Sequence, residues 1–211
     1  MASKSTAGRT RGARGPYAKS EAVRQNILEN CIEVFSENGF YGATMRDVAQ
    51  RSGISHTGLL HHFASKEELL RAVLVARYEQ TGASIRSHSL GEFFETQMRV
   101  IEDNLVRPGI IQLHSTISAE ATVPSHPAHD YFASRFDNFR LYLTRVFEEL
   151  GAAGRLRSGT SPAILASLYI AVLDGLQVQW LYNPEEVDIA GAVQAFLDAV
   201  ADLNKESAAP A

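Results

Sequence analysis

Apolar residues recur at intervals of three and four along most of the chain, and this helical period constrains the fold more than any other feature. Glycines and prolines interrupt the pattern where helices are expected to end. No convincing alternation of apolar and polar residues indicates a strand. The period therefore predicts an all-α protein of about nine helices. The clearest apolar series are Ile27, Leu28, Cys31, Ile32 and Phe35; Phe132, Phe136, Phe139, Leu143 and Phe147; and Leu165, Leu168, Val172, Leu176 and Trp180.

Composition narrows the class of protein. Hydrophobic residues make up 45% of the 211 residues, which is ample for a core, and no apolar run reaches the ~18 residues of a membrane span. The basic start of the chain lacks the apolar segment of a secretory signal. A single cysteine, Cys31, excludes an internal disulfide and a cysteine-rich zinc site. We expect a cytoplasmic protein without a membrane partner.

The charge distribution is uneven. The net charge is −4, yet residues 1–20 contain Lys4, Arg9, Arg11, Arg14 and Lys19 and no acid, so the rest of the chain carries about −9. A cationic arm on an acidic body favours contact with a polyanion at one end of the protein, although a solubilising tail has the same composition. We expect residues 1–19 to form a flexible basic arm.

Two short helices are predicted between Thr44 and Phe63. Thr44 and Asp47 have the spacing of a capping box, and Ser55 is placed to cap a second helix. Ser65 and Glu68 form another capping-box pattern at the start of a longer helix.

The turn between these two short helices has the spacing of a helix-turn-helix. Ala49 is small where two helices must cross closely, and Gly53 follows at the turn, where a positive φ is required. Ile54 and Leu59 are expected to pack the second helix against the first. Gly58 lies inside the second helix, either because its backbone approaches DNA closely or because it relieves crowding between helices.

In a helix-turn-helix the second helix enters the major groove, and base contacts come from its N-terminal residues. Helix N-termini also bind phosphates through free N–H groups. The three histidines of this stretch lack the i, i+4 spacing of two metal ligands on one helix face, so we expect no metal there. The candidate DNA contacts are Thr44, Arg46, Ser55, His56, Thr57, Gly58, His61, His62 and Lys66.

The segment FSENGFYGATMRDVAQRSGISHTGLLHHFASKEELLRAVL, residues 35–74, resembles the N-terminal domain of TetR-type transcriptional regulators. The segment AVLDGLQVQWLYNPEEVDI is similar to the penultimate helix of several members. The resemblance implies a DNA-binding domain over residues 20–65, a ligand-binding and dimerisation domain over 66–205 and a flexible tail over 206–211. Leu60 and His62 occupy positions where the family often has tyrosines that touch the DNA backbone, which implies a different base preference.

The same resemblance implies a homodimer that pairs through its last two helices, a palindromic double-stranded operator and a small-molecule effector that releases it. Repression is the commoner mode in the family. We expect the effector cavity among the helices from Phe93 to Trp180, although most of these apolar residues would serve equally as core. Asp174 and Gln177 are expected to meet either the ligand or the dimer partner. The candidate lining residues are Phe93, Phe94, Met98, His114, Phe132, Phe136, Asp174, Gln177 and Trp180.

Two alternatives stay open at this point. His126, His129 and Asp130 lie close together after a proline and would suit a helical metal-dependent enzyme. Against an enzyme, the chain has no P-loop, no G-x-S-x-G elbow and no H-E-x-x-H motif, so we expect neither catalytic residues nor a cofactor. The second alternative is a helical scaffold without DNA binding, which a salt-dependent shift of promoter DNA would exclude.

Overall fold

The computed structural model describes residues 16–85 and 90–203, and over these ranges the chain forms nine helices and no strand. The only pairing of extended backbone in these ranges is an isolated bridge between Leu156 and Ala201. The predicted all-α fold is confirmed. The helices are α1 Pro16–Gly42, α2 Met45–Arg51, α3 His56–His62, α4 Lys66–Ile85, α5 Leu90–Leu105, α6 Pro108–Glu120, α7 His129–Ala152, α8 Pro162–Tyr182 and α9 Ile189–Val200.

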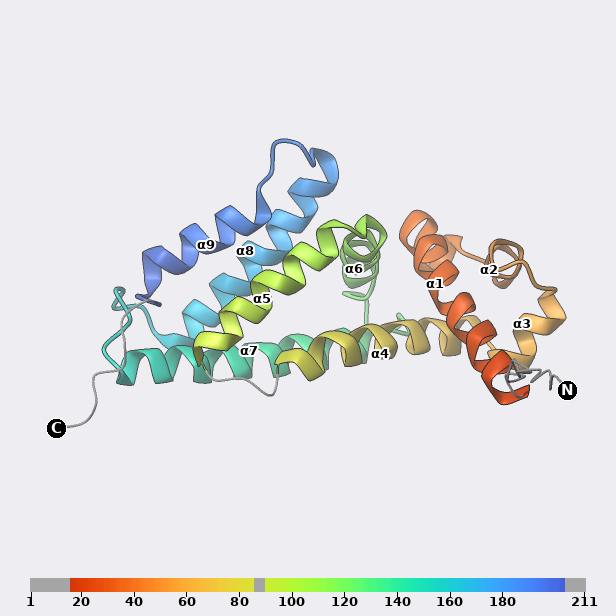
Figure 1. Ribbon diagram of the computed structural model, residues 1–211, viewed down its shortest axis with the longest axis horizontal. Coiled ribbons are helices and arrows are strands. Elements are labelled where there is room, and N and C mark those ends of the chain that lie inside the picture. The colour runs from red at the N-terminus through yellow and green to blue at the C-terminus, as the bar shows by residue number, and fades with distance from the viewer. Residues whose placement is uncertain (1–15, 86–89, 204–211) are drawn as a thin grey trace, which may run out of the picture.

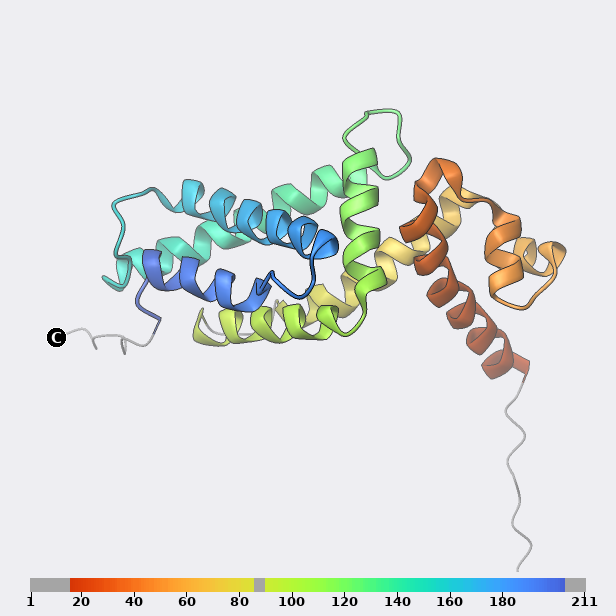
Figure 2. The ribbon, with the colours of Figure 1, turned by 90° about the horizontal axis from the view of Figure 1, so that it is seen from above.

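The molecule is elongated, with different helices at its two ends. Helices α1, α2 and α3 lie at one end, and α8 and α9 lie at the other in both views (Figures 1 and 2). Helix α6 stands between these ends and packs against α1. The two short helices therefore project from the far end of the molecule.

A first core joins α1 to α4 with α6. Leu59 of α3 and Leu69 of α4 are fully buried in it, and Ile117 of α6 reaches in from the other part of the chain. The first half of α4 thus belongs to this core, although we expected the N-terminal domain to end at residue 65. Helix α1 begins at Pro16, so residues 16–19 of the expected arm are helical, as proline at a first helical position permits. Residues 1–15 and 204–211, with the rest of the arm and the whole expected tail, lie outside the described residues.

A second core joins α5, α7, α8 and α9. Its largest fully buried side chains are aromatic, with Phe93 of α5, Phe147 of α7 and Tyr169 of α8 packed among branched aliphatic residues. Burial raises the pKa of the Tyr169 phenol, and its hydroxyl has no hydrogen-bond partner among the described residues. The two cores meet along α7, which contributes Phe132 to the first core and Leu143 to the second, while Phe136 packs against both.

Candidate functional site

Both short helices begin with the caps that the sequence predicts. The Thr44 hydroxyl accepts a hydrogen bond from the Asp47 N–H (3.2 Å), and the Asp47 carboxylate accepts one from the Thr44 N–H (3.0 Å), which completes the capping box of α2. The Ser55 hydroxyl accepts from the Gly58 N–H (3.0 Å) at the start of α3. These local bonds satisfy N–H groups that a helix start leaves unpaired, so both helices can form despite their seven-residue length.

The turn between α2 and α3 follows the predicted packing. Gly53 has φ +68°, a backbone conformation that favours glycine, and Ala49 and Leu59 are buried on either side of it. A Cβ at Gly58 would meet only the Ser55 hydroxyl, at 3.1 Å, and no neighbouring helix. Crowding between helices is therefore not the reason for Gly58.

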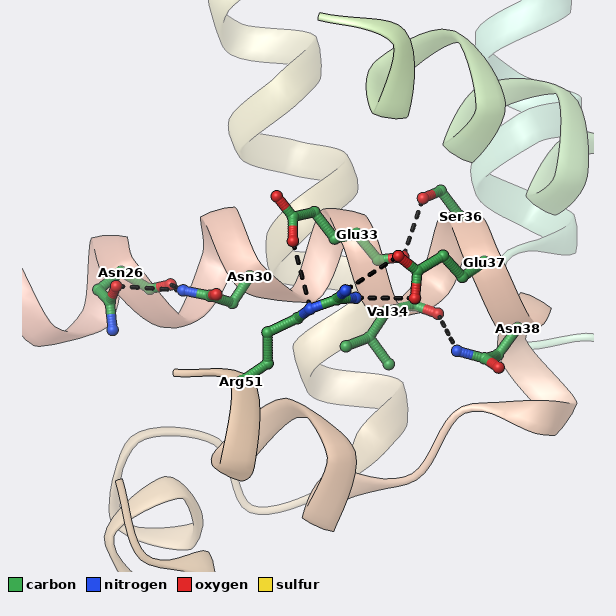
Figure 3. Close-up of polar contacts among 8 residues, drawn as sticks. All are labelled: Asn26, Asn30, Glu33, Val34, Ser36, Glu37, Asn38 and Arg51. Atoms are coloured by element: carbon green, nitrogen blue, oxygen red, sulfur yellow. Dashed lines mark hydrogen bonds and ion pairs between the residues drawn. The ribbon is translucent and has the colours of Figure 1, made fainter. Parts of the chain in front are cut away.

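Side chains of α1 hold the helix pair α2–α3 in place from outside the core. Arg51 of α2 donates two hydrogen bonds to Glu37 of α1, at 2.8 and 3.0 Å, and lies 3.3 Å from Glu33 (Figure 3). The Arg51 hydrogen bond lowers the pKa of the exposed Glu37 carboxyl. Asn26 donates to the Ser52 carbonyl in the turn (2.9 Å). These contacts fix the orientation of α2 relative to α1, and the sequence reading did not identify them because the partners are far apart in the chain.

Six of the predicted DNA contacts are exposed, and four of these have no intramolecular role. Arg46 lies on α2, while His56, Thr57 and His61 lie on α3, whose single fully buried residue is Leu59. None of these four side chains has a hydrogen-bond partner within residues 16–85 and 90–203. They remain available to an external partner. His62 is half-buried at the end of the same helix.

Three other predicted contacts already have intramolecular roles. The Thr44 and Ser55 hydroxyls serve as helix caps. The Lys66 ammonium donates to the carbonyls of Phe40 (2.7 Å) and Ala43 (2.9 Å) and lies 4.4 Å from the centre of the Phe40 ring. Lysine near a helix C-terminus satisfies carbonyls that have no partner in the helix. Lys66 therefore joins the start of α4 to the end of α1, and a phosphate contact by it stays a prediction.

A polar joint connects α6 to the end of α1. Glu120 of α6 accepts a hydrogen bond from the Phe40 N–H (2.8 Å), directly after Gly39, where φ +66° and ψ −178° interrupt the helix. The φ of Gly39 is left-handed while its ψ is extended, and a Cβ there would overlap the Glu120 carboxylate. His126 is buried beside this contact, with its Nε2 3.6 Å from Glu120 and its ring edge-on to Phe40. Burial lowers the pKa of His126, against the opposing effect of Glu120.

A cavity of about 410 Å³ lies among α4, α5, α6, α7 and α8. Its volume suits a small organic molecule. Five of the nine predicted lining residues border it, and His114 Nε2 lies 3.4 Å from the Asp174 carboxylate across the α6–α8 interface. These five are His114, Phe132, Phe136, Asp174 and Gln177.

The other four predicted lining residues do not border this cavity. Phe93 and Phe94 are buried in the second core, with their ring centres 5.0 Å apart, and Met98 and Trp180 pack against the same core. Helical periodicity shows which face of a helix is apolar. It does not show whether that face packs tightly against a neighbouring helix or lines a cavity. Cavity wall and solid core therefore look alike in the sequence.

Several polar residues of the cavity wall were missed by the sequence reading. Arg77 lies on α4, outside the range that we expected to contribute, and Arg135 and Arg145 lie on α7 between the predicted apolar residues. Gln97 and Asn104 lie on α5, and Asn104 accepts a hydrogen bond from Arg77. No local signal identifies these residues, because the wall exists only once five helices have packed.

The residues of the alternative metal site have separate partners. The His126 Nδ1 accepts a hydrogen bond from the Ala128 N–H (3.1 Å), the His129 Nδ1 lies 2.8 Å from the Ala121 carbonyl, and Asp130 is exposed. In the part of the chain that the structure describes, no three histidine, cysteine or acidic residues are grouped to hold a metal ion. The geometry offers no support for the metal-dependent enzyme.

Helix α8 is apolar on two faces. One face is buried in the second core through Leu165 and Tyr169, while Leu168, Val178 and Tyr182 are exposed on the other. Of the helices in the described ranges, α8 alone is long and apolar enough to cross a membrane, with a mean hydropathy of 1.4, a property not expected from the sequence reading. The exposed face is an apolar surface that a monomer leaves in contact with water.

Two family models match separate parts of the chain. Residues 27–73 match the model for bacterial regulatory proteins of the tetR family, and residues 118–205 match the model for the C-terminal part of BetI-type transcriptional repressors. The HTH-type transcriptional regulator UidR of Escherichia coli K12 is 36% identical over 80 residues. These 80 residues are 38% of this chain and 41% of UidR, so the chain matches less than half of that relative's length.

Solved structures share the fold over most of the chain. A TetR-family transcriptional regulator from Agrobacterium tumefaciens superposes with a TM-score of 0.73 at 18% identity, covering 87% of this chain and 100% of the other. A transcriptional regulator from Saccharomonospora viridis in complex with choline superposes with a TM-score of 0.67 at 19% identity, covering 86% and 99%.

Proposed function

Since this chain belongs to the TetR family of transcriptional regulators, we propose that it is a ligand-responsive repressor. As a homodimer it binds a palindromic operator in double-stranded DNA, and a small-molecule effector releases it. It acts in the cytoplasm and performs no catalysis.

The observation that carries the DNA-binding role is the exposed start of α3. Helix α3 lies at one end of the molecule (Figure 1), and His56 and Thr57 in its first turn are exposed and have no hydrogen-bond partner among the described residues. Imidazole and hydroxyl groups donate to and accept from base edges in the major groove. Arg46 and His61 flank this turn and suit phosphate contacts. Gly58 lets the backbone of α3 approach the duplex.

The exposed apolar face of α8 supports the homodimer. Leu168 and Val178 would be covered when α8 and α9 pack against the same helices of a second copy. A two-fold pair then presents two α3 helices to half-sites about 34–36 Å apart, one turn of DNA. The C-terminal family match, which covers α8 and α9, belongs to a repressor model.

The cavity supports the effector role. It borders α4 and α6, and both of these helices also pack on α1 in the DNA-binding end. A ligand that fits better when these helices shift would move the two α3 helices relative to each other. The S. viridis regulator with the same fold holds choline, which agrees with a small-molecule effector of some kind.

The DNA-binding role is tested with the double variant His56→Ala and Thr57→Ala. We expect at least about tenfold loss of preference for the operator over random DNA, because base readout is removed while backbone contacts stay. The measurement is a footprint and a gel shift on the chain's own promoter DNA, at two salt concentrations.

The matched control is Glu148→Ala with Glu149→Ala, two exposed residues near the C-terminal end of α7. Both double variants should keep the wild-type melting temperature and mass in solution. An unchanged footprint in the His56 and Thr57 variant would remove these residues from base readout.

A further inference from the structure

The cavity wall is positively charged, although the chain as a whole has a net charge of −4. Arg77 of α4 and Arg135 and Arg145 of α7 border it, and Asp174 is the only carboxylate among the described residues of its wall. Asp174 already has a partner, since the His114 Nε2 lies 3.4 Å from its Oδ1. Even without Arg77, the two arginines of α7 outnumber this carboxylate, so the described part of the wall is cationic.

The arginines lie close enough to disturb one another. Burial lowers the pKa of Arg77, and the neighbouring Arg107 and Arg135 lower it further, against the opposing effects of Tyr131 and Asp103. Within the described ranges no carboxylate lies within 4.0 Å of the Arg135 or Arg145 guanidinium. Like charges gathered in a partly buried place destabilise the empty site and are relieved by a bound anion.

The remainder of the wall is apolar and aromatic. Phe132, Phe136 and Phe139 come from successive turns of α7, and Leu74 and Ile101 contribute from α4 and α5. Asn138, Leu141 and Arg145 also border the cavity and are exposed, which marks the side on which it opens. A ligand that enters there passes an arginine before it reaches the phenylalanines.

Two buried amides add a hydrogen-bonding requirement. The Gln97 Nε2 and the Gln177 Oε1 have no hydrogen-bond partner among the described residues, and both side chains border the cavity. A buried donor and a buried acceptor without partners are unfavourable, and a ligand with a carbonyl or hydroxyl group would satisfy one of them.

We propose that the cavity takes an amphipathic organic anion, with an aromatic or branched hydrocarbon body against the phenylalanines of α7 and an acidic group paired with Arg135. This inference rests on the effector role in the proposed function and names the class of that effector. Arginine suits the acidic group because its planar guanidinium donates two parallel hydrogen bonds to a carboxylate or sulfonate.

The test uses two fluorescent probes with the same aromatic body. One is 1-anilinonaphthalene-8-sulfonate, an anion, and the other is N-phenyl-1-naphthylamine, which lacks the sulfonate. Each is titrated into the full chain at fixed ionic strength without DNA. We expect R135Q to weaken binding of the anionic probe by about tenfold and that of the neutral probe by less than about twofold.

Two matched variants separate charge at the cavity from other effects. R140Q removes an exposed arginine of the same helix that does not border the cavity, so it should leave the binding of both probes unchanged. R135K keeps the charge and should retain most of the affinity for the anion. If R135Q loses its fold, R145Q replaces it, because it removes an exposed arginine of the same wall and should weaken the anionic probe more than the neutral one. Equal effects of R145Q on the two probes would then overturn the anion class.

The cationic alternative is tested by displacement of the neutral probe with trimethyl(1-naphthylmethyl)ammonium. Equal effects of R135Q on the binding of the two probes would overturn the anion class. So would displacement of the neutral probe by the cation, if D174N abolishes that displacement and R135Q leaves it intact. Anionic binding that is insensitive to R135Q would place the probe elsewhere, such as on the exposed face of α8, and would also overturn it. Because no DNA is present, none of these results depends on whether the chain binds an operator.

Discussion

The helix pair α2–α3 and the cavity are built by different kinds of contact. In the helix pair, the bonds that begin each helix join residues three apart, Thr44 with Asp47 and Ser55 with Gly58. In the cavity, the wall extends from Leu74 to Gln177 and draws on five helices. The first region is therefore encoded locally, whereas the second exists only after distant helices have packed.

This difference bears on how a signal passes between the two regions. A locally capped helix pair keeps its own shape when its surroundings move, so it can be displaced as a rigid unit. The cavity changes shape when any of its helices shifts. The joint between Glu120 and Phe40 lies on α6, which borders the cavity and packs on α1. It is placed to turn a change in the cavity into a displacement of α1 and the helices attached to it.

The largest expected effect on stability comes from a substitution that removes a buried contact of the helix pair α2–α3. Leu59 is fully buried in the first core, so Leu59→Ala should lower the free energy of unfolding by about 3 kcal/mol. Its neighbour Leu60 is 42% exposed, and Leu60→Ala should change stability by less than about 0.5 kcal/mol. Denaturant unfolding of both variants measures the difference, and equal values would mean that α3 is not anchored through Leu59.

An intermediate effect is expected at the joint. Gly39→Ala forces a side chain into a backbone conformation that is almost restricted to glycine and into the Glu120 carboxylate, which should cost about 2 kcal/mol. The control is Gly42→Ala in the same helix, where a Cβ would make an ordinary 3.5 Å contact with Asn38. Thermal unfolding compares the two. A stable Gly39→Ala protein would show that the joint between α6 and α1 does not hold the observed geometry.

The smallest expected effect is a pH dependence of the free energy of unfolding, caused by His126 at the same joint. Because burial lowers the pKa of His126, the ring stays neutral in the folded chain while the unfolded chain takes up a proton below the ordinary value of 6.5. The free energy of unfolding should therefore fall as the pH drops below 6.5, by under about 1 kcal/mol for this group. His126→Gln should show a smaller loss between pH 7.5 and 5.5 than the wild type, with the exposed His56→Gln as reference. Identical pH dependence in wild type and His126→Gln would contradict this assignment.

The residues that could be predicted from the sequence are those with local signals. Caps at Thr44 and Ser55, the positive φ at Gly53 and the burial of Leu59 follow from residues within one or two turns. The role of Lys66 was not predictable, since its ammonium binds carbonyls more than 20 residues earlier in the chain. The attachment of Arg51 to Glu37 across 14 residues was missed for the same reason.

The sequence by itself determined the all-α class, the ends of most helices and the exposed polar start of α3, because hydrophobic period and capping depend on residues three or four apart. Only the tertiary structure decided which apolar faces form solid core and which enclose a cavity. It placed Phe93 and Phe94 in the core, and it brought Arg77 and Arg135 to the same cavity wall as Asp174. The physical reason is that a helix face has the same apolar pattern whether its neighbour packs tightly against it or leaves room for a ligand.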